Sequence, residues 1–148
     1  MNETVARLSG AVWREGQPLG SYLVRVARLL EERLDAALSE VGLSPAKLQV
    51  LTQLVEAQGP VALSELAARM CCVRSNVTQL IDRMETDGLV RRVDDPADRR
   101  AVRAELTRVG RERQAEGAHR FARLEEELQS RLDGEDREAL VDLLGRLV

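Results

Sequence analysis

Five polar side chains lie close together in the middle of the chain, at Ser75, Asn76, Thr78, Gln79 and Arg83. Hydroxyl, amide and guanidinium groups of these types form hydrogen bonds with base edges in the major groove of DNA. The apolar residues of the same segment recur at helical spacing, at Val77, Leu80, Ile81 and Met84. The pattern predicts a helix from about residue 74 that buries one face and presents polar groups on the other.

A second polar group follows in residues 94–100, which end in Arg99 and Arg100. Apolar residues alternate with polar ones on both sides of it, in 89–93 and 101–106, and this alternation predicts a β-hairpin with a charged tip. An arginine at such a tip can enter a narrow minor groove, where the negative potential is concentrated.

The flanking segments predict helices that position these groups. A long amphipathic helix is expected to end at Gly42, and the predicted start of the next helix is Ser44–Pro45. That second helix should stop before Gly59–Pro60, and the expected cap of a third, short helix is Ser64. Gly88 should close the polar-faced helix.

Beyond the hairpin, Thr107 should cap another long helix, and Asp133–Gly134 should precede a last helix rich in leucine. The apolar stripes of the terminal helices exceed what one small lobe can cover, which favours a homodimer over helices that fold back on their own chain. A twofold dimer would present two polar helices about 34 Å apart, one turn of DNA, to a pseudo-palindromic site.

The 148 residues carry a net charge of −3, but the charge is segregated. Residues 69–113 contain eleven arginines and eight acidic residues, whereas the remainder contains 11 basic and 17 acidic residues. A basic middle between acidic ends is typical of a protein that meets phosphates with one face. The sequence shows no apolar segment long enough to span a bilayer and no leader pattern, so the expected location is the cytoplasm and no membrane partner is expected.

Three segments, "LSELAARM", "SNVTQLIDRMETDGLVRR" and "DDPADRRAVRAELTRVG", together resemble the MarR family of multiple antibiotic resistance regulators. The resemblance runs from about Leu19 to the C-terminus. It implies that Arg74, Ser75, Asn76, Thr78 and Gln79 face the major groove. It also implies that Asp98 braces the wing while Arg100, aided by Arg99, enters the minor groove.

The expected fold class is mainly α: a winged helix-turn-helix with a two-stranded β-hairpin wing and long N- and C-terminal dimerisation helices. We expect a single domain over residues 1–148. The DNA-binding lobe should span about 44–106, and the helical dimerisation region about 18–42 and 107–148.

The expected function is regulation of transcription, as a repressor, or less often an activator, that occupies double-stranded DNA and is released by a small-molecule effector, with no cofactor. Release by an effector is what the resemblance implies. Cys71 and Cys72 lie just before the polar-faced helix, so an alternative function is a thiol-based redox sensor. The other interpretation is that one or both cysteines are small apolar residues buried in the core. Trp13 could line an effector pocket or dock the N-terminal segment on the partner subunit.

An enzyme is not expected. The chain has no phosphate-cradling glycine loop and no H-E-x-x-H motif, and His119 is the one histidine. A winged-helix module that binds another protein remains an alternative, and a steep salt dependence of duplex binding would separate the two.

Overall fold

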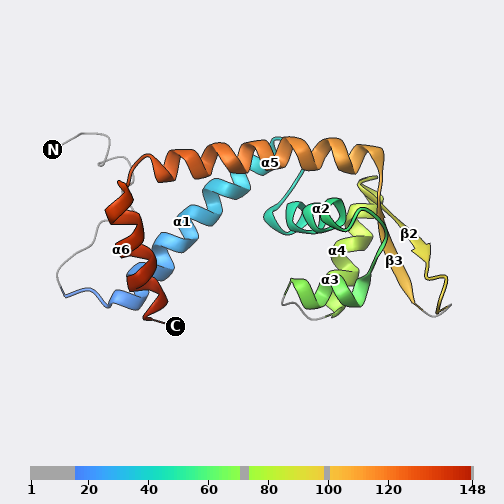
Figure 1. Ribbon diagram of the computed structural model, residues 1–148, viewed down its shortest axis with the longest axis horizontal. Helices are drawn as coiled ribbons and strands as arrows, with labels where there is room; N and C mark the ends of the chain where they lie inside the picture. Colours follow the sequence, from blue (N-terminus) through green and yellow to red (C-terminus); the bar gives the residue numbers. More distant parts are fainter. Residues whose placement is uncertain (1–15, 71–73, 99–100, 148) are drawn as a thin grey trace.

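The computed structural model describes residues 16–70, 74–98 and 101–147 (Figure 1). Its elements are α1 (Leu19–Ser39), α2 (Pro45–Ala57), β1 (Val61–Ala62), α3 (Leu63–Arg69), α4 (Arg74–Thr86), β2 (Val90–Asp94), β3 (Val102–Leu106), α5 (Arg108–Gln129) and α6 (Gly134–Gly145). The long helix α5 forms the top of the molecule. A lobe of α2, α3, α4 and the strands lies beneath one end of α5, and α6 and the start of α1 lie at the other (Figure 1). The predicted mainly helical winged fold is confirmed.

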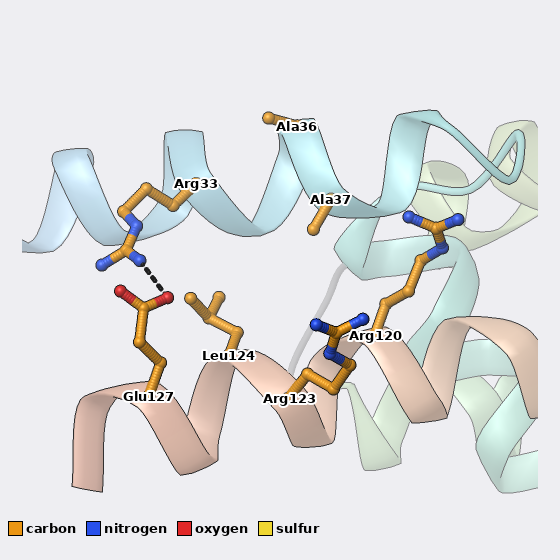
Figure 2. A pocket seen from close by; sticks show the side chains of 7 residues that line it. All are labelled: Arg33, Ala36, Ala37, Arg120, Arg123, Leu124 and Glu127. Carbon is orange, nitrogen blue, oxygen red and sulfur yellow. Dashed lines mark hydrogen bonds and ion pairs between the residues drawn. The ribbon is translucent and has the colours of Figure 1, made fainter. Parts of the chain in front are cut away.

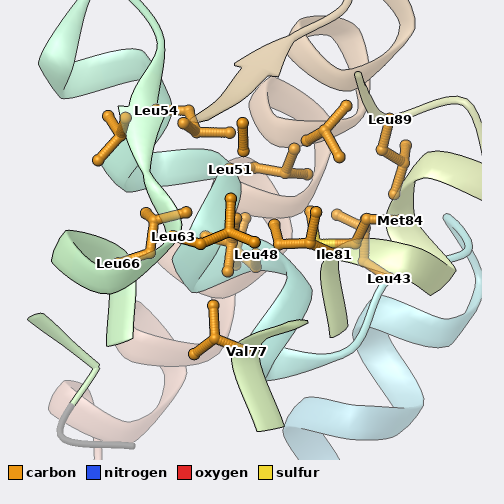
Figure 3. Packing of buried hydrophobic residues seen from close by; sticks show 14 of the residues in the cluster. Leu43, Leu48, Leu51, Leu54, Leu63, Leu66, Val77, Ile81, Met84 and Leu89 are labelled. Atoms are coloured by element: carbon orange, nitrogen blue, oxygen red, sulfur yellow. The ribbon is translucent and has the colours of Figure 1, made fainter. Parts of the chain in front are cut away.

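The lobe has one hydrophobic core, to which its helices and its sheet contribute (Figure 3). Leu51 and Leu54 of α2 meet Leu66 of α3 and Ile81 of α4, and all four are at most 1% exposed. Burial of this kind contributes roughly 1.5–3 kcal/mol for each large aliphatic side chain, so this core is what fixes α4 in place.

Three of the predicted helix starts are confirmed by hydrogen bonds. The side chains of Ser44, Thr107 and Asp133 accept from the backbone N–H groups three residues further on, at 3.3, 2.9 and 2.8 Å. Each bond satisfies a donor that the first turn of a helix leaves free. These caps therefore set where α2, α5 and α6 begin.

The predicted cap of α3 was wrong. The helix begins at Leu63, its N-cap residue is Ala62, and no side chain caps it. Leu63 is buried at 6% exposure and Val61 pairs with β3, so strand pairing and core packing start the helix earlier than the Ser64 signal indicated.

Glycines in the left-handed region follow two helices as predicted. Gly42 has φ +70° after α1, and Gly88 has φ +71° after α4. The N–H of Leu89 reaches back to the carbonyl of Met84 at 2.9 Å, which closes α4 and turns the chain into the hairpin.

The sheet has three antiparallel strands in the order β1-β3-β2. The predicted hairpin pairs Val90 with Leu106 and Asp94 with Val102. The two-stranded wing forms as expected, and a third strand joins it, because Val61 and Ala62 pair with Ala104 and Arg103. The short extended piece after Pro60 thus attaches the wing to the start of the helix-turn-helix.

Within the described ranges, no helix combines the length and the apolar character needed to cross a membrane.

Candidate nucleic-acid interface

Helix α4 presents a polar face to solvent. Val77, Ile81 and Met84 are at most 1% exposed, and they fix the helix rotation against the core. Ser75, Asn76, Gln79 and Arg83 are exposed, and Thr78 is half-buried. The side chains that the sequence pattern selected therefore share one accessible surface, as a helix that enters a groove requires.

The start of this helix is described in part. Arg74 is the first residue of α4, and Cys71 and Cys72 lie outside the described residues. Their role as thiol sensors or as apolar core residues stays a prediction. Among the residues that the structure describes, no group of His, Cys, Asp and Glu is arranged to hold a metal ion.

A buried acidic residue organises the loop of the wing. Asp95 is 7% exposed and accepts a hydrogen bond from the backbone N–H of Ala97 at 2.8 Å. Its second oxygen accepts from Nε of Arg103 at 2.6 Å, and Arg103 also donates to the carbonyl of Pro60 at 3.2 Å. Backbone donation by Ala97, reinforced by Arg103, holds the pKa of the Asp95 carboxyl below its ordinary value.

The predicted tip residues follow Asp95 closely in the sequence. Arg99 and Arg100 are outside the described residues. Asp98 is exposed, and its carbonyl accepts a hydrogen bond from the backbone N–H of Ala101 at 2.9 Å. That Asp98 braces the tip through its side chain remains a prediction.

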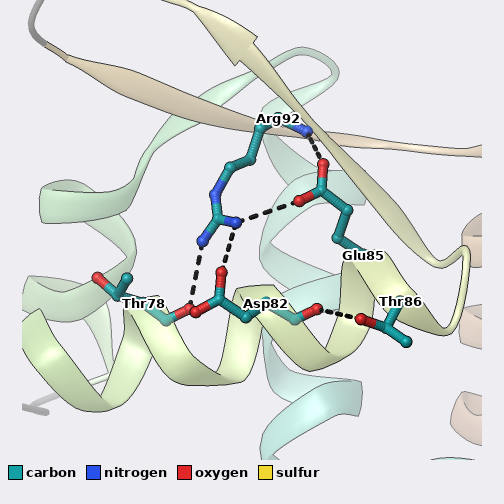
Figure 4. Close-up of polar contacts among 5 residues, drawn as sticks. All are labelled: Thr78, Asp82, Glu85, Thr86 and Arg92. Carbon is teal, nitrogen blue, oxygen red and sulfur yellow. Dashed lines mark hydrogen bonds and ion pairs between the residues drawn. The ribbon is translucent and has the colours of Figure 1, made fainter.

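Arg92 joins helix α4 to strand β2, and sequence reasoning missed it (Figure 4). Its guanidinium lies 2.5 Å from Asp82 and 3.1 Å from Glu85, and it donates to the carbonyl of Thr78 at 3.4 Å. Asp95 and Arg103 were missed as a pair as well. The available signal was alternation: Arg91 and Arg92 are neighbours in a strand, so one of them had to point towards the helix.

A separate groove between α1 and α5 is lined by arginines (Figure 2). Its volume is about 490 Å³, and Arg33, Arg120 and Arg123 contribute guanidinium groups to it. Arg33 pairs with Glu127 at 2.7 Å, and together with Arg131 it lowers the pKa of that carboxyl. Arg120 pairs with Glu40, so these pairs fasten the end of α1 to α5.

The family model described as the MarR family matches residues 43–102. An HTH-type transcriptional regulator of Bacillus subtilis, YhbI, is 31% identical over 112 residues that cover 73% of each chain. A second B. subtilis regulator, YkoM, is 40% identical over 73 residues, which cover 49% of this chain and 47% of YkoM. The chain spans about half to two thirds of the length of YkoM and of two further B. subtilis regulators, YsmB and YdgJ, of which it covers 60% and 64%.

Two solved structures resemble the whole arrangement. A putative MarR-like transcription regulator from Bacillus cereus gives a TM-score of 0.77 at 30% identity, covering 87% of this chain and 92% of that one. The transcriptional repressor CouR, bound to a 23-mer DNA duplex, gives 0.77 at 30% identity, covering 92% and 98%. The chain belongs to the MarR family, a family of transcription regulators and not of enzymes.

Proposed function

We propose that this chain is a DNA-binding transcription regulator of the cytoplasm that occupies a pseudo-palindromic operator as a homodimer. The observation that carries the proposal is the exposed polar face of α4, held against a wing whose loop leads into Arg99 and Arg100. A helix for the major groove and an arginine for the minor groove are the two parts that direct readout needs. The duplex-bound CouR structure supports it, because this chain shares its fold at 30% identity.

The homodimer rests on apolar surface at the end of the molecule away from the lobe. None of the residues of α6 is buried, and Leu140, Leu143 and Leu144 are 43%, 55% and 42% exposed. Leu19 and Val24 of α1 are also exposed. A second copy of the chain is the partner that covers a matching patch on both subunits at once.

The effector proposal rests on a cavity between the lobe and the terminal helices. This cavity, of about 460 Å³, is lined by Leu34 of α1, Leu48 and Gln53 of α2, and Gln114 and Phe121 of α5, among others. Oε1 of Gln53 is buried and accepts no hydrogen bond from the described residues. A small molecule with an apolar body and one hydrogen-bond donor fits these walls. Bound between α2 and α5, it would change the distance between these helices. The spacing of the two lobes would change with it, and the operator would be released.

The first experiment selects duplexes that the purified protein retains from genomic fragments and measures their affinity as a function of salt. The binding constant should fall steeply with salt: on a plot of its logarithm against the logarithm of salt concentration, the slope is about −0.9 for each phosphate neutralised. Arg100→Ala should lower affinity by about tenfold, as expected for loss of a base or groove contact. Arg131→Ala removes the same charge just after the far end of α5, away from the wing, and is the matched control.

Failure to retain any duplex at low salt would contradict the proposal and favour the protein-binding module. A flat salt response would do the same. Loss of duplex binding on oxidation, abolished by Cys71→Ser with Cys72→Ser, would instead support the thiol sensor.

The effector is tested separately, by a thermal-shift screen of small aromatic and aliphatic compounds against the dimer. A true effector should raise the unfolding temperature and release the selected duplex. Gln53→Leu, which keeps the volume but removes the free acceptor, should abolish both effects. A compound that acts equally on this variant binds elsewhere.

A further inference from the structure

Arg92 makes its contacts with α4 at three positions on one face of the helix (Figure 4). The guanidinium reaches the Thr78 carbonyl at 3.4 Å and the side chains of Asp82 and Glu85 at 2.5 and 3.1 Å. These positions are spaced i, i+4 and i+7, so they lie above one another along two turns. A planar guanidinium that bonds to the helix at three successive positions restrains both the rotation of the helix and its shift along its axis.

Strand β2 contributes a second restraint beside the first. It is an edge strand of the sheet, and the backbone N–H of Arg92 donates to Oε1 of Glu85 at 2.9 Å. Glu85 therefore accepts from both the backbone and the side chain of the same residue. The Arg92 side chain is 28% exposed, so its bonds are less screened by water than those of a fully solvated pair.

We propose that Arg92 is a positioning residue for sequence-specific recognition, one that fixes the reading helix α4 relative to the wing. This inference rests on the proposed function. Base readout by α4 and groove insertion by the wing occur together only if the two elements keep a fixed separation and angle. Arg92 is the described side chain that bonds to α4 from β2, so it sets that relation without touching DNA itself.

A purely electrostatic role makes a different prediction. Asp82 and Glu85 place two carboxylates on α4, and Arg92 offsets their repulsion from phosphates. If charge were all that mattered, Arg92→Lys would behave as the wild type, and loss of Arg92 would weaken binding to every duplex equally. If Arg92 acts by positioning α4, Arg92→Lys should not restore specific binding, because a single ammonium group cannot bond to all three positions along the helix.

The experiment compares two probes: a duplex recovered by the wild-type protein from a random library, and a shuffled duplex of the same composition. For Arg92→Ala we expect the ratio of the two affinities to fall about tenfold, within the range of coupling in such networks. Binding to the shuffled duplex should change little. Arg92→Lys should recover less than half of the lost ratio on a logarithmic scale.

Arg91→Ala is the matched control, since Arg91 neighbours Arg92 on β2 but pairs with Glu105 on β3. It should lower both affinities together and leave their ratio unchanged. Glu85→Gln keeps Arg92 and its strand, so it tests the same link should Arg92→Ala not fold, and it too should lower the ratio. Unfolding temperatures of all variants are measured alongside.

An unchanged ratio in both Arg92→Ala and Glu85→Gln overturns the inference and leaves the proposed function standing. Full recovery by Arg92→Lys overturns it in favour of charge compensation. A wild-type protein that prefers no duplex over its shuffled form overturns the proposed function, and the inference with it.

Discussion

The lobe and the terminal helices are built on opposite principles. In the lobe, α2, α3, α4 and the sheet surround a core with members such as Leu51 and Ile81 that are fully buried. At the far end, α6 buries none of its residues, and α1 buries Leu38 alone, at the end where it meets α5. The core of the lobe is enclosed by its own elements, whereas the terminal helices keep apolar side chains exposed in the part of the chain that the structure describes.

The difference shows how one sequence can separate two tasks. Reading a duplex needs side chains held in fixed positions, which a dry core and several caps provide. In the proposed homodimer, an interface between subunits would set the distance between the two reading lobes, and the exposed leucines of α6 offer apolar surface for it. Gly110 and Gly117 of α5 lie where the two regions meet.

The largest effect is expected in the core of the lobe. Leu51→Ala leaves a cavity at a fully buried site and should lower the free energy of unfolding by about 2–5 kcal/mol. Urea denaturation measures it, and Val141→Ala in α6, where the side chain is 71% exposed, is the control. Equal losses in the two variants would erase the contrast between the regions.

Substitution of Gly110 should lower stability where α5 packs on the hairpin. A Cβ there would lie 2.0 Å from the backbone carbonyl oxygen of Leu89, and backbone cannot give way as a side chain can. We expect Gly110→Ala to cost about 1–3 kcal/mol of unfolding free energy, despite the better helix propensity of alanine. At Gly117 the nearest atoms belong to the side chains of Leu43 and Leu48, so Gly117→Ala should cost less. The reverse order would mean that α5 is not seated on the hairpin in solution.

Substitutions in the terminal helices should weaken the association of the two subunits. Leu140→Ala with Leu144→Ala removes exposed apolar surface from α6 without lowering its helix propensity. The dissociation constant of the dimer, measured by sedimentation, should rise at least about tenfold, as for interface anchors. Circular dichroism of the lobe should be unchanged, and Glu138→Ala is the control on the same helix. A dimer unaffected by the double substitution would place the interface elsewhere.

The sequence predicted what depends on local spacing. Apolar residues at helical intervals located α4 and its exposed polar face, and Thr107 and Gly88 located the ends of elements. Contacts between elements were not predictable in this way. Arg91 and Arg92 are the same residue type in adjacent positions, yet one pairs across the sheet and the other with α4, which only the packing decides.

The wing anchor is a further case, because nothing in the run of charges from 94 to 100 distinguishes Asp95 from its acidic neighbours. Only the fold brings Arg103 and the carbonyl of Pro60 to the same point. The Asp95–Arg103 pair therefore provides the smallest and most local test of how the wing is held.

This test uses pH. The pKa of the Asp95 carboxyl lies below its ordinary value of 3.8, chiefly because the N–H of Ala97 donates to the charged form and Arg103 donates as well. A carboxyl with a depressed pKa in the folded state contributes stability above its unfolded pKa and loses it as pH falls through the folded pKa. The free energy of unfolding should therefore be higher for the wild type than for Asp95→Asn by a constant amount between about pH 6 and 8. That difference should shrink below about pH 4. Glu127→Gln, at an exposed site whose carboxyl pKa is also lowered, should show a smaller difference with the same sign. A difference for Asp95→Asn that persists at low pH would mean that shape, rather than the charged pair with Arg103, holds the wing in place.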